Sequence, residues 1–297
     1  MNPLLVSNST TPVDTRNIAK TQGISPASAQ SRPFVYAVGS IVPDFPSLCV
    51  EKEFLQSLPA QAAQQLHANT TSSKALSMAS LTPYFYEVLS TESNFHLARE
   101  MQWNFINADN NQLFRIIPSS NARLKELINA TKINPDKKQV DRQVLVGRKK
   151  SSAHVLMTRL SSVSEAKLVA TVCAKNSAID QTKLLPIIEF ILSLQANDGS
   201  SVKSRAINYA LYFNPEIYIK SYELLYGTAS NGANPSGYQL LGIKTRQQEY
   251  NGGHQVDIVF DYAGINSGAP QSWYCSVDVS GEFPYLLKTF ARFLPNE

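Results

Sequence analysis

Residues 204–215 read Ser-Arg-Ala-Ile-Asn-Tyr-Ala-Leu-Tyr-Phe-Asn-Pro, and this stretch decides the fold that we predict. Its apolar residues Ile207, Ala210 and Leu211 recur at helical spacing and predict the buried side of a helix. The closing Asn-Pro pair ends this helix and opens a second, because proline suits a first helical turn and disfavours helix in the residue before it. We expect the second helix to end at Gly227, since glycine readily forms a left-handed cap.

Strands are predicted on both sides of this helix pair. Three strand-like stretches separated by turn-forming residues follow it and indicate an antiparallel meander, at residues 238–246, 255–262 and 273–279. Before it, β-branched and aromatic residues predict strands at 34–41 and 167–173, and an apolar stretch predicts a helix at 186–195. Because strands and helices do not alternate regularly, we predict an α+β fold, with mostly antiparallel sheets, a central helix pair and a C-terminal strand meander.

The N-terminal stretch differs in composition from the rest of the chain. It is rich in Ser, Thr, Asn, Gln, Ala and Pro and carries little apolar surface to bury. We therefore expect residues 1–33 to be a disordered polar tail. The remainder has a suitable size for one large domain, so we expect residues 34–297 to fold as a single unit.

The charge balance argues against nucleic-acid binding. The chain of 297 residues carries 27 basic and 23 acidic residues, for a net charge of +4, which is too even to indicate a basic binding surface. The basic run Arg148-Lys149-Lys150 follows a glycine, and we interpret it as a solvated turn.

Cysteine usage and hydropathy indicate the compartment. The three cysteines lie far apart in the sequence, which fits a reducing cytoplasm better than a secreted disulfide framework. No apolar run approaches the roughly 20 residues that a membrane-spanning helix needs. We expect a cytoplasmic protein with no membrane partner.

Carboxylates on the C-terminal strands form one candidate site. If the second and third strands of the meander pair, Asp257, Asp261 and Asp278 share one polar face with Ser276. Close carboxylates can raise one another's pKa and serve acid–base chemistry, or they can bind a cation. The alternative, which we favour, is an ordinary solvated sheet face.

The polar side of the first central helix forms a second candidate site. Arg205, Asn208 and Tyr212 follow one another at helical spacing. A planar guanidinium beside an amide and a phenol suits a carboxylate or a peptide backbone. In the alternative that we favour, Arg205 pairs with a carboxylate near the last strand of the meander, such as Asp278 or Glu282, and ties helix to sheet.

Motifs of established chemistry are missing from the sequence. It contains no phosphate-binding glycine loop, paired-histidine zinc helix, Cys-x-x-Cys pair or Gly-x-Ser-x-Gly elbow. His254 and Cys275, on neighbouring predicted strands, are weak candidates for a zinc site, and a surface histidine with a buried thiol is the favoured alternative. We expect no tightly bound metal and no cofactor.

Four stretches, taken in order, resemble a known family. They are Phe-Val-Tyr-Ala-Val-Gly-Ser-Ile at 34–41, Leu-Ala-Arg-Glu-Met-Gln-Trp at 97–103, Arg-Ala-Ile-Asn-Tyr-Ala at 205–210 and Val-Asp-Val-Ser-Gly-Glu-Phe-Pro at 277–284. Together they resemble the domain of unknown function at the C-terminus of the cyanobactin maturation proteases, the subtilisin-like enzymes of patellamide-type pathways. The resemblance runs from about Phe34 to the C-terminus of what we expect to be a free-standing chain.

The resemblance implies a pathway but no reaction. In those proteases the domain follows a catalytic serine protease domain, and nothing in this sequence matches that catalytic machinery. The family often has a cysteine immediately before the tryptophan of the second stretch, where this chain has Gln102, which weakens the case for a cysteine-dependent metal site.

Three hypotheses follow for the function. The first is a non-catalytic accessory module of ribosomal peptide maturation that binds a precursor peptide or a processing enzyme such as the maturation protease. The second is a peptide-modifying enzyme that uses the carboxylate face or a metal, and the third is a structural homodimerisation domain. The candidate binding residues are Arg99, Arg205, Asn208, Tyr212, Asp278 and Glu282.

Overall fold

The computed structural model describes residues 33–69, 78–134, 139–194, 197–227, 237–250 and 253–294. These residues belong to one compact unit, whereas the predicted polar tail lies almost entirely outside the described ranges. None of the helices in these ranges is both long and apolar enough to cross a membrane.

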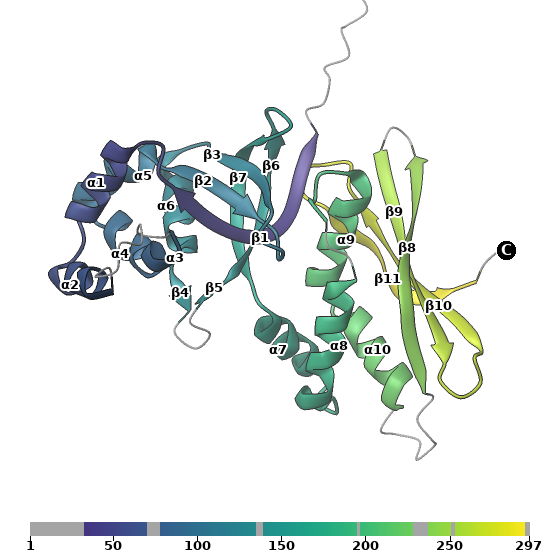
Figure 1. The fold of residues 1–297 in the computed structure, drawn as a ribbon. Helices are drawn as coiled ribbons and strands as arrows, with labels where there is room; N and C mark the ends of the chain where they lie inside the picture. The colour runs from purple at the N-terminus through teal and green to yellow at the C-terminus, as the bar shows by residue number, and fades with distance from the viewer. Residues whose placement is uncertain are drawn as a thin grey trace, which may run out of the picture. The chain divides into compact units, whose positions relative to one another are not determined.

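The N-terminal half is built around a closed five-stranded barrel (Figure 1). Its strands, in the order in which they pair, are β1 (Phe34–Asp44), β2 (Gln102–Ile106), β3 (Gln112–Pro118), β7 (His154–Val163) and β6 (Arg142–Lys149). The β3–β7 pair is parallel and the other four pairs are antiparallel. β1 closes the barrel because its first half pairs with β6 and its second half with β2.

Short helices cover one side of the barrel and share its apolar core. They are α1 (Leu48–Gln56), α2 (Ala60–Asn69), α3 (Met78–Leu81), η1 (Thr82–Tyr84), α4 (Phe85–Leu89), η2 (Glu92–Asn94), α5 (Phe95–Glu100) and α6 (Asn121–Ala130). Two paired strands of two residues each, β4 (Ile133–Asn134) and β5 (Gln139–Val140), follow α6. Side chains on these helices, such as Phe54 and Leu127, pack with Trp103 and Phe105 of β2 in one buried cluster. Ser47 and Ser120 accept hydrogen bonds from helical N–H groups and so fix where α1 and α6 begin.

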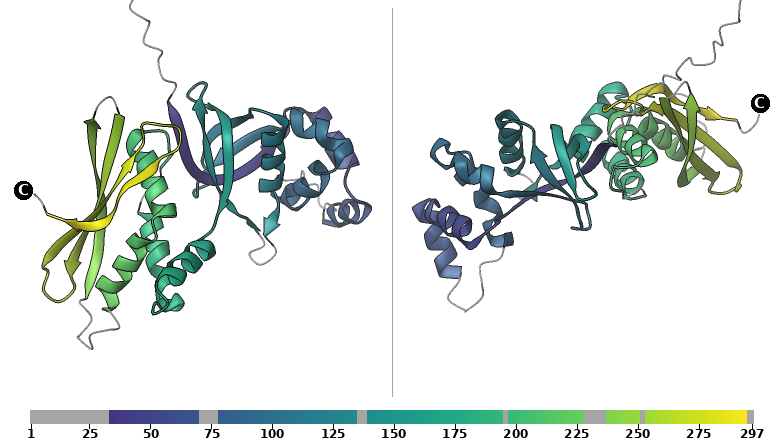
Figure 2. Two further views of the ribbon diagram at one scale, coloured as in Figure 1. Left: turned by 180° about the vertical axis from the view of Figure 1, so that it is seen from behind. Right: turned by 90° about the horizontal axis from the view of Figure 1, so that it is seen from above.

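The C-terminal half is a helical layer on an antiparallel sheet (Figures 1 and 2). The helices are α7 (Glu165–Lys175), α8 (Gln181–Ser193), α9 (Val202–Phe213) and α10 (Glu216–Tyr226), and the strands are β8 (Tyr238–Tyr250), β9 (Gly253–Gly264), β10 (Pro270–Asp278) and β11 (Tyr285–Phe293). The sheet order is β11-β10-β9-β8. The predicted α+β class, the central helix pair and the C-terminal meander are therefore confirmed.

The helix pair α9–α10 lies at the centre because α9 packs against both halves. A capping box between Ser201 and Ser204 starts α9, and Gly227, at φ 85°, ends α10 as predicted. On its barrel side, the ring of Tyr209 of α9 packs edge-to-face against the ring of Tyr36, with the two ring centroids 6.0 Å apart. On its other side, Ile207 belongs to the apolar cluster that includes the inner face of β9. Because both sides are covered, the polar residues Ser204, Arg205 and Asn208 of α9 are buried as well.

Two local predictions were wrong, and one strand was not predicted. Residues 167–173 lie in α7 rather than in a strand, because Ser164 caps the helix and Leu168 and Val172 bury one of its faces. α8 begins before Pro186, since Asp180 accepts a hydrogen bond from the N–H of Thr182 at 2.9 Å. The edge strand β11 was missed altogether, because its largely exposed side chains give little hydrophobic alternation.

Candidate functional site

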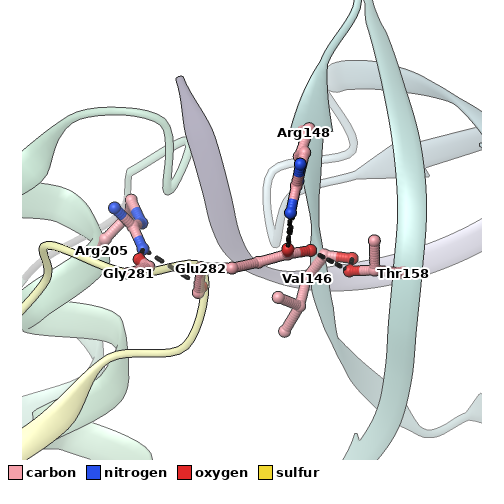
Figure 3. Close-up of polar contacts among 6 residues, drawn as sticks. All are labelled: Val146, Arg148, Thr158, Arg205, Gly281 and Glu282. Carbon is pink, nitrogen blue, oxygen red and sulfur yellow. Dashed lines mark hydrogen bonds and ion pairs between the residues drawn. The ribbon is translucent and has the colours of Figure 1, made fainter. Parts of the chain in front are cut away.

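Arg205 holds α9 to the turn between β10 and β11 (Figure 3). Its side chain is buried and donates hydrogen bonds to the backbone carbonyls of Val279 at 2.9 Å, Gly281, and Glu282 at 3.1 Å. The predicted tie between helix and sheet is present, but its acceptors are carbonyls and not a carboxylate. Burial lowers the pKa of Arg205 to about 10, opposed by the charges of Glu282 and Asp278, so the group stays cationic at neutral pH.

The Glu282 carboxylate points away from Arg205 and toward the barrel (Figure 3). One of its oxygens accepts two hydrogen bonds from Arg148 of β6, at 3.1 and 2.9 Å, and the other accepts one from Thr158 of β7. The guanidinium groups of Arg148 and Arg205 both lie over the ring of Phe34. Their Cζ atoms are 5.4 and 5.2 Å from the ring centroid. This turn thus connects α9 with the barrel. Arg148 lies in strand β6, so the interpretation of this residue as part of a solvated turn is wrong.

Asn208 is a second connection between α9 and the barrel. The side-chain amide N–H of Asn208 donates a hydrogen bond to the carbonyl of Tyr36 at 2.9 Å. Its side-chain oxygen accepts a hydrogen bond from the side-chain amide of Asn197 at 2.9 Å. The N–H of Tyr36 donates in turn to the carbonyl of Gly199 at 2.8 Å. The β1 backbone at Tyr36 is therefore held by both the loop before α9 and the helix itself.

Tyr212 lies at the meeting point of three cavities between the barrel and helices α7–α9. The cavities measure about 460, 70 and 290 Å³, and Tyr212 lines all three. The first two also share Arg142 and Glu165, while the second and third share Val163 and Ser164, so the second cavity adjoins both of the others. We call these three adjoining cavities the Tyr212 groove.

Charged and polar side chains line the Tyr212 groove. Asp109, Glu165 and Glu189 line its first cavity, and Arg159 and Lys167 line the third. Burial raises the pKa of Tyr212, although Arg142, which donates to its hydroxyl at 3.5 Å, counteracts this. The phenol therefore stays protonated at neutral pH and can donate a hydrogen bond.

The structure divides the predicted binding residues among three places. Asn208 and Tyr212 line the groove, whereas Arg205, Asp278 and Glu282 lie at or near the β10–β11 turn. Arg99 is on α5 and lines another cavity. The groove residues Arg142, Arg159 and Glu189 were missed, because isolated charges on separate elements leave no sequence pattern.

The three C-terminal carboxylates share a sheet face but are satisfied separately. The register pairs Asp257 with Ser276, Asp261 with Ser272 and Asp278 with Gln255, as the predicted pairing requires. Asp257 is buried and accepts hydrogen bonds from Gln248, Gln255 and Ser276. Burial opposes ionisation of Asp261, but hydrogen bonds from Lys244 and Ser272 outweigh it and lower its pKa.

Comparison with known proteins gives the family. Residues 34–154 match the family model described as PatG Domain, and residues 175–293 match the one described as PatG C-terminal. The chain belongs to the PatG-like domains of cyanobactin maturation. A solved structure described as a PatG Domain of Unknown Function has a similar fold over 88% of this chain and 99% of that one, with a TM-score of 0.63 and 14% identity. A search of curated proteins gave no match.

The PatG-like fold separates the two candidate zinc ligands. Cys275 pairs with Ile258 in the β9–β10 register, four positions along β9 from His254. Cys275 also faces the core and is fully buried. Within the described ranges, no group of three or more His, Cys, Asp or Glu residues is arranged to hold a metal ion. Gln102, where the family often has cysteine, starts β2 and pairs with Asp44.

Cysteine reactivity follows from this arrangement. Burial raises the pKa of Cys275 to about 12, whereas Cys49 lies exposed on α1. The thiolate is the nucleophile, so we expect iodoacetamide to modify Cys49 in the folded protein and leave Cys275 intact. Peptide mass spectrometry after native alkylation checks this, with alkylation in denaturant as the control. Early modification of Cys275 would contradict its place in the core.

Proposed function

We propose that this chain is an accessory, non-catalytic module of cyanobactin maturation that binds an extended precursor peptide along the Tyr212 groove. Membership of the PatG-like domains supports the pathway. One observation carries the binding site: three neighbouring cavities meet at a single tyrosine, between secondary-structure elements that come from both halves of the fold. A series of adjoining cavities suits a peptide chain, which can place successive side chains in them, better than the flatter face of a folded enzyme.

The lining of the groove supports a peptide ligand. An extended peptide presents unpaired N–H and C=O groups, which need polar partners when they leave water. Ser162, Ser164 and Tyr212 supply hydroxyl groups along the groove. Hydroxyls can both donate and accept hydrogen bonds, so they suit both kinds of backbone group.

The distribution of charge supports a preferred peptide direction. The carboxylates of Asp109 and Glu189 line one end, and the cations of Arg159 and Lys167 line the other. Among the described residues, Glu189, Arg159 and Lys167 have no hydrogen-bond or ion-pair partner for their side chains. A basic segment of the peptide at the first end and an acidic segment at the second would complement these charges.

The non-catalytic role is supported by the state of the titratable groups. Burial raises the pKa of Tyr36, Tyr212 and Tyr262, and it does the same for the thiol of Cys275. Each of these groups is therefore held in its neutral form, which disfavours it as a nucleophile or base at neutral pH.

Charge reversal in the groove tests this function. We expect Glu189→Lys to weaken binding of a fluorescently labelled full-length precursor peptide by roughly 5- to 30-fold, because an attractive contact becomes repulsive. Fluorescence anisotropy at low salt measures the change, since added salt screens exposed charges. Glu249→Lys, which makes the same charge change on the exposed part of β8, is the matched control.

Two outcomes would contradict the proposal. Equal affinities for the Glu189→Lys variant, the Glu249→Lys variant and the unmodified chain would remove the groove as the binding site. A changed peptide mass after incubation with the chain would favour a peptide-modifying enzyme over a binding module.

A further inference from the structure

A further cavity, separate from the three cavities of the Tyr212 groove, lies among the helices beside the barrel. Its volume is about 700 Å³, and it is bounded by the end of α4, the η2–α5 segment and α6. It shares no lining residue with the three cavities of the groove. We call it the Arg99 pocket; its lining residues Phe95, Arg99 and Lys125 carry the argument.

Two cations of the Arg99 pocket lie over the same aromatic ring. The guanidinium of Arg99 is 5.1 Å from the centroid of Phe95, and the ammonium of Lys125 is 5.9 Å from it. Arg99 also donates a long hydrogen bond, of 3.4 Å, to the side-chain oxygen of Asn121. These contacts position the two side chains while leaving most of their N–H donors available.

Neither cation is neutralised by an acidic side chain within the described part of the chain. The nearby Glu126 of α6 already pairs with Arg123, so it does not serve Lys125. Glu92 is the one carboxylate among the lining residues, against the two cations. The start of α6, capped by Ser120, adds a partial positive charge on the same side as Asn121. The pocket is therefore electropositive.

The Arg99 pocket also presents aromatic surface. Tyr86 and Phe95 line it and are only partly buried, packing against the core of the barrel half. A ligand that fills the pocket therefore meets apolar surface beside the two cations. A bare inorganic anion would leave this surface uncovered, whereas a peptide with carboxylates beside an apolar side chain would cover it.

We propose that the Arg99 pocket binds an acidic peptide segment. Carboxylates of that segment contact Arg99 and Lys125, and a neighbouring apolar side chain packs on the accessible parts of Tyr86 and Phe95. The volume lies within the roughly 300–1,000 Å³ that is usual for ligand sites. This site stands independently of the proposed peptide groove, since the two share no residue.

A synthetic peptide pair tests the proposal. The probe is a labelled ten-residue peptide of alternating Glu and Leu, and the comparison peptide replaces each Glu with Gln. We expect the double variant Arg99→Gln/Lys125→Gln to bind the Glu-Leu peptide at least roughly tenfold more weakly, because two charge-assisted contacts are lost. Lys52→Gln/Lys203→Gln removes two exposed lysines elsewhere and should bind it like the unmodified chain.

The readout separates this pocket from its alternatives. Fluorescence anisotropy should show tight binding only for the Glu-Leu peptide, and thermal melts should match for all variants because the four replaced side chains are exposed. Equal binding of the Gln-Leu peptide would overturn the proposal in favour of an apolar surface. Competition by inorganic phosphate at the same concentration as the peptide would overturn it in favour of a phosphate site. Unchanged affinity of the Arg99→Gln/Lys125→Gln variant would place the binding elsewhere.

Discussion

Replacing Arg205 with alanine should destabilise the protein by about 3–4 kcal/mol, because it leaves a buried carbonyl without its donor and breaks two further charged hydrogen bonds. The guanidinium reaches the carbonyls of Val279, Gly281 and Glu282. Val279 is buried, so water cannot replace the lost donor there. Arg205→Lys should lower the stability by about half as much, since one ammonium group cannot reproduce the branched set of hydrogen bonds that the guanidinium makes to the three carbonyls. Chemical denaturation, followed by circular dichroism, measures the free energy of unfolding.

The control for this prediction lies on the same helix. Lys203 is exposed near the start of α9, and we expect Lys203→Ala to change stability by no more than about 0.5 kcal/mol. The folded Arg205→Ala variant should still bind the precursor peptide normally, because Arg205 lies outside the Tyr212 groove. Weakened binding with unchanged stability would instead make Arg205 a peptide ligand and contradict its structural role.

The sequence predicts those elements of the fold that local signals determine. The helix break before Pro215, the cap at Gly227 and the three strands of the meander all rest on patterns within a few neighbouring residues. The strand predicted at residues 167–173 failed for the opposite reason. Its β-branched residues favour a strand, but the cap at Ser164 and the packing of Leu168 decide for helix.

The candidate site depends on contacts that no local pattern reveals. Glu282 was predicted near Arg205, and its backbone does lie there, yet its carboxylate pairs with Arg148, which is 134 residues away in sequence. Closure of the barrel depends on the non-local pairing of β1 with β6. Tyr212 could be placed on a helix face from its spacing, but the groove around it exists only because the barrel and the helices meet there.

Gly199→Ala should destabilise the protein by about 3–5 kcal/mol, because the new methyl group would meet the backbone of β1. An added Cβ would lie 2.2 Å from the carbonyl oxygen of Tyr36 and 2.5 Å from the Cα of Ala37. The strand must then move away and give up two hydrogen bonds at Tyr36, from its N–H to Gly199 and from Asn208 to its carbonyl. The positive φ of 65° at Gly199 adds strain for any L-residue.

Gly268→Ala isolates the contribution of the close approach. Gly268 has almost the same backbone angle, φ 66°, but an added Cβ there would meet nothing within 4 Å. The Gly268→Ala variant should therefore lose only about 1 kcal/mol of stability, from the left-handed conformation alone. Denaturation midpoints of the two variants measure the difference, which reports how firmly β1 is held against the loop before α9. Equal losses for both variants would show that β1 yields to the methyl group, and that the hydrogen bonds at Tyr36 contribute little to joining the barrel and α9.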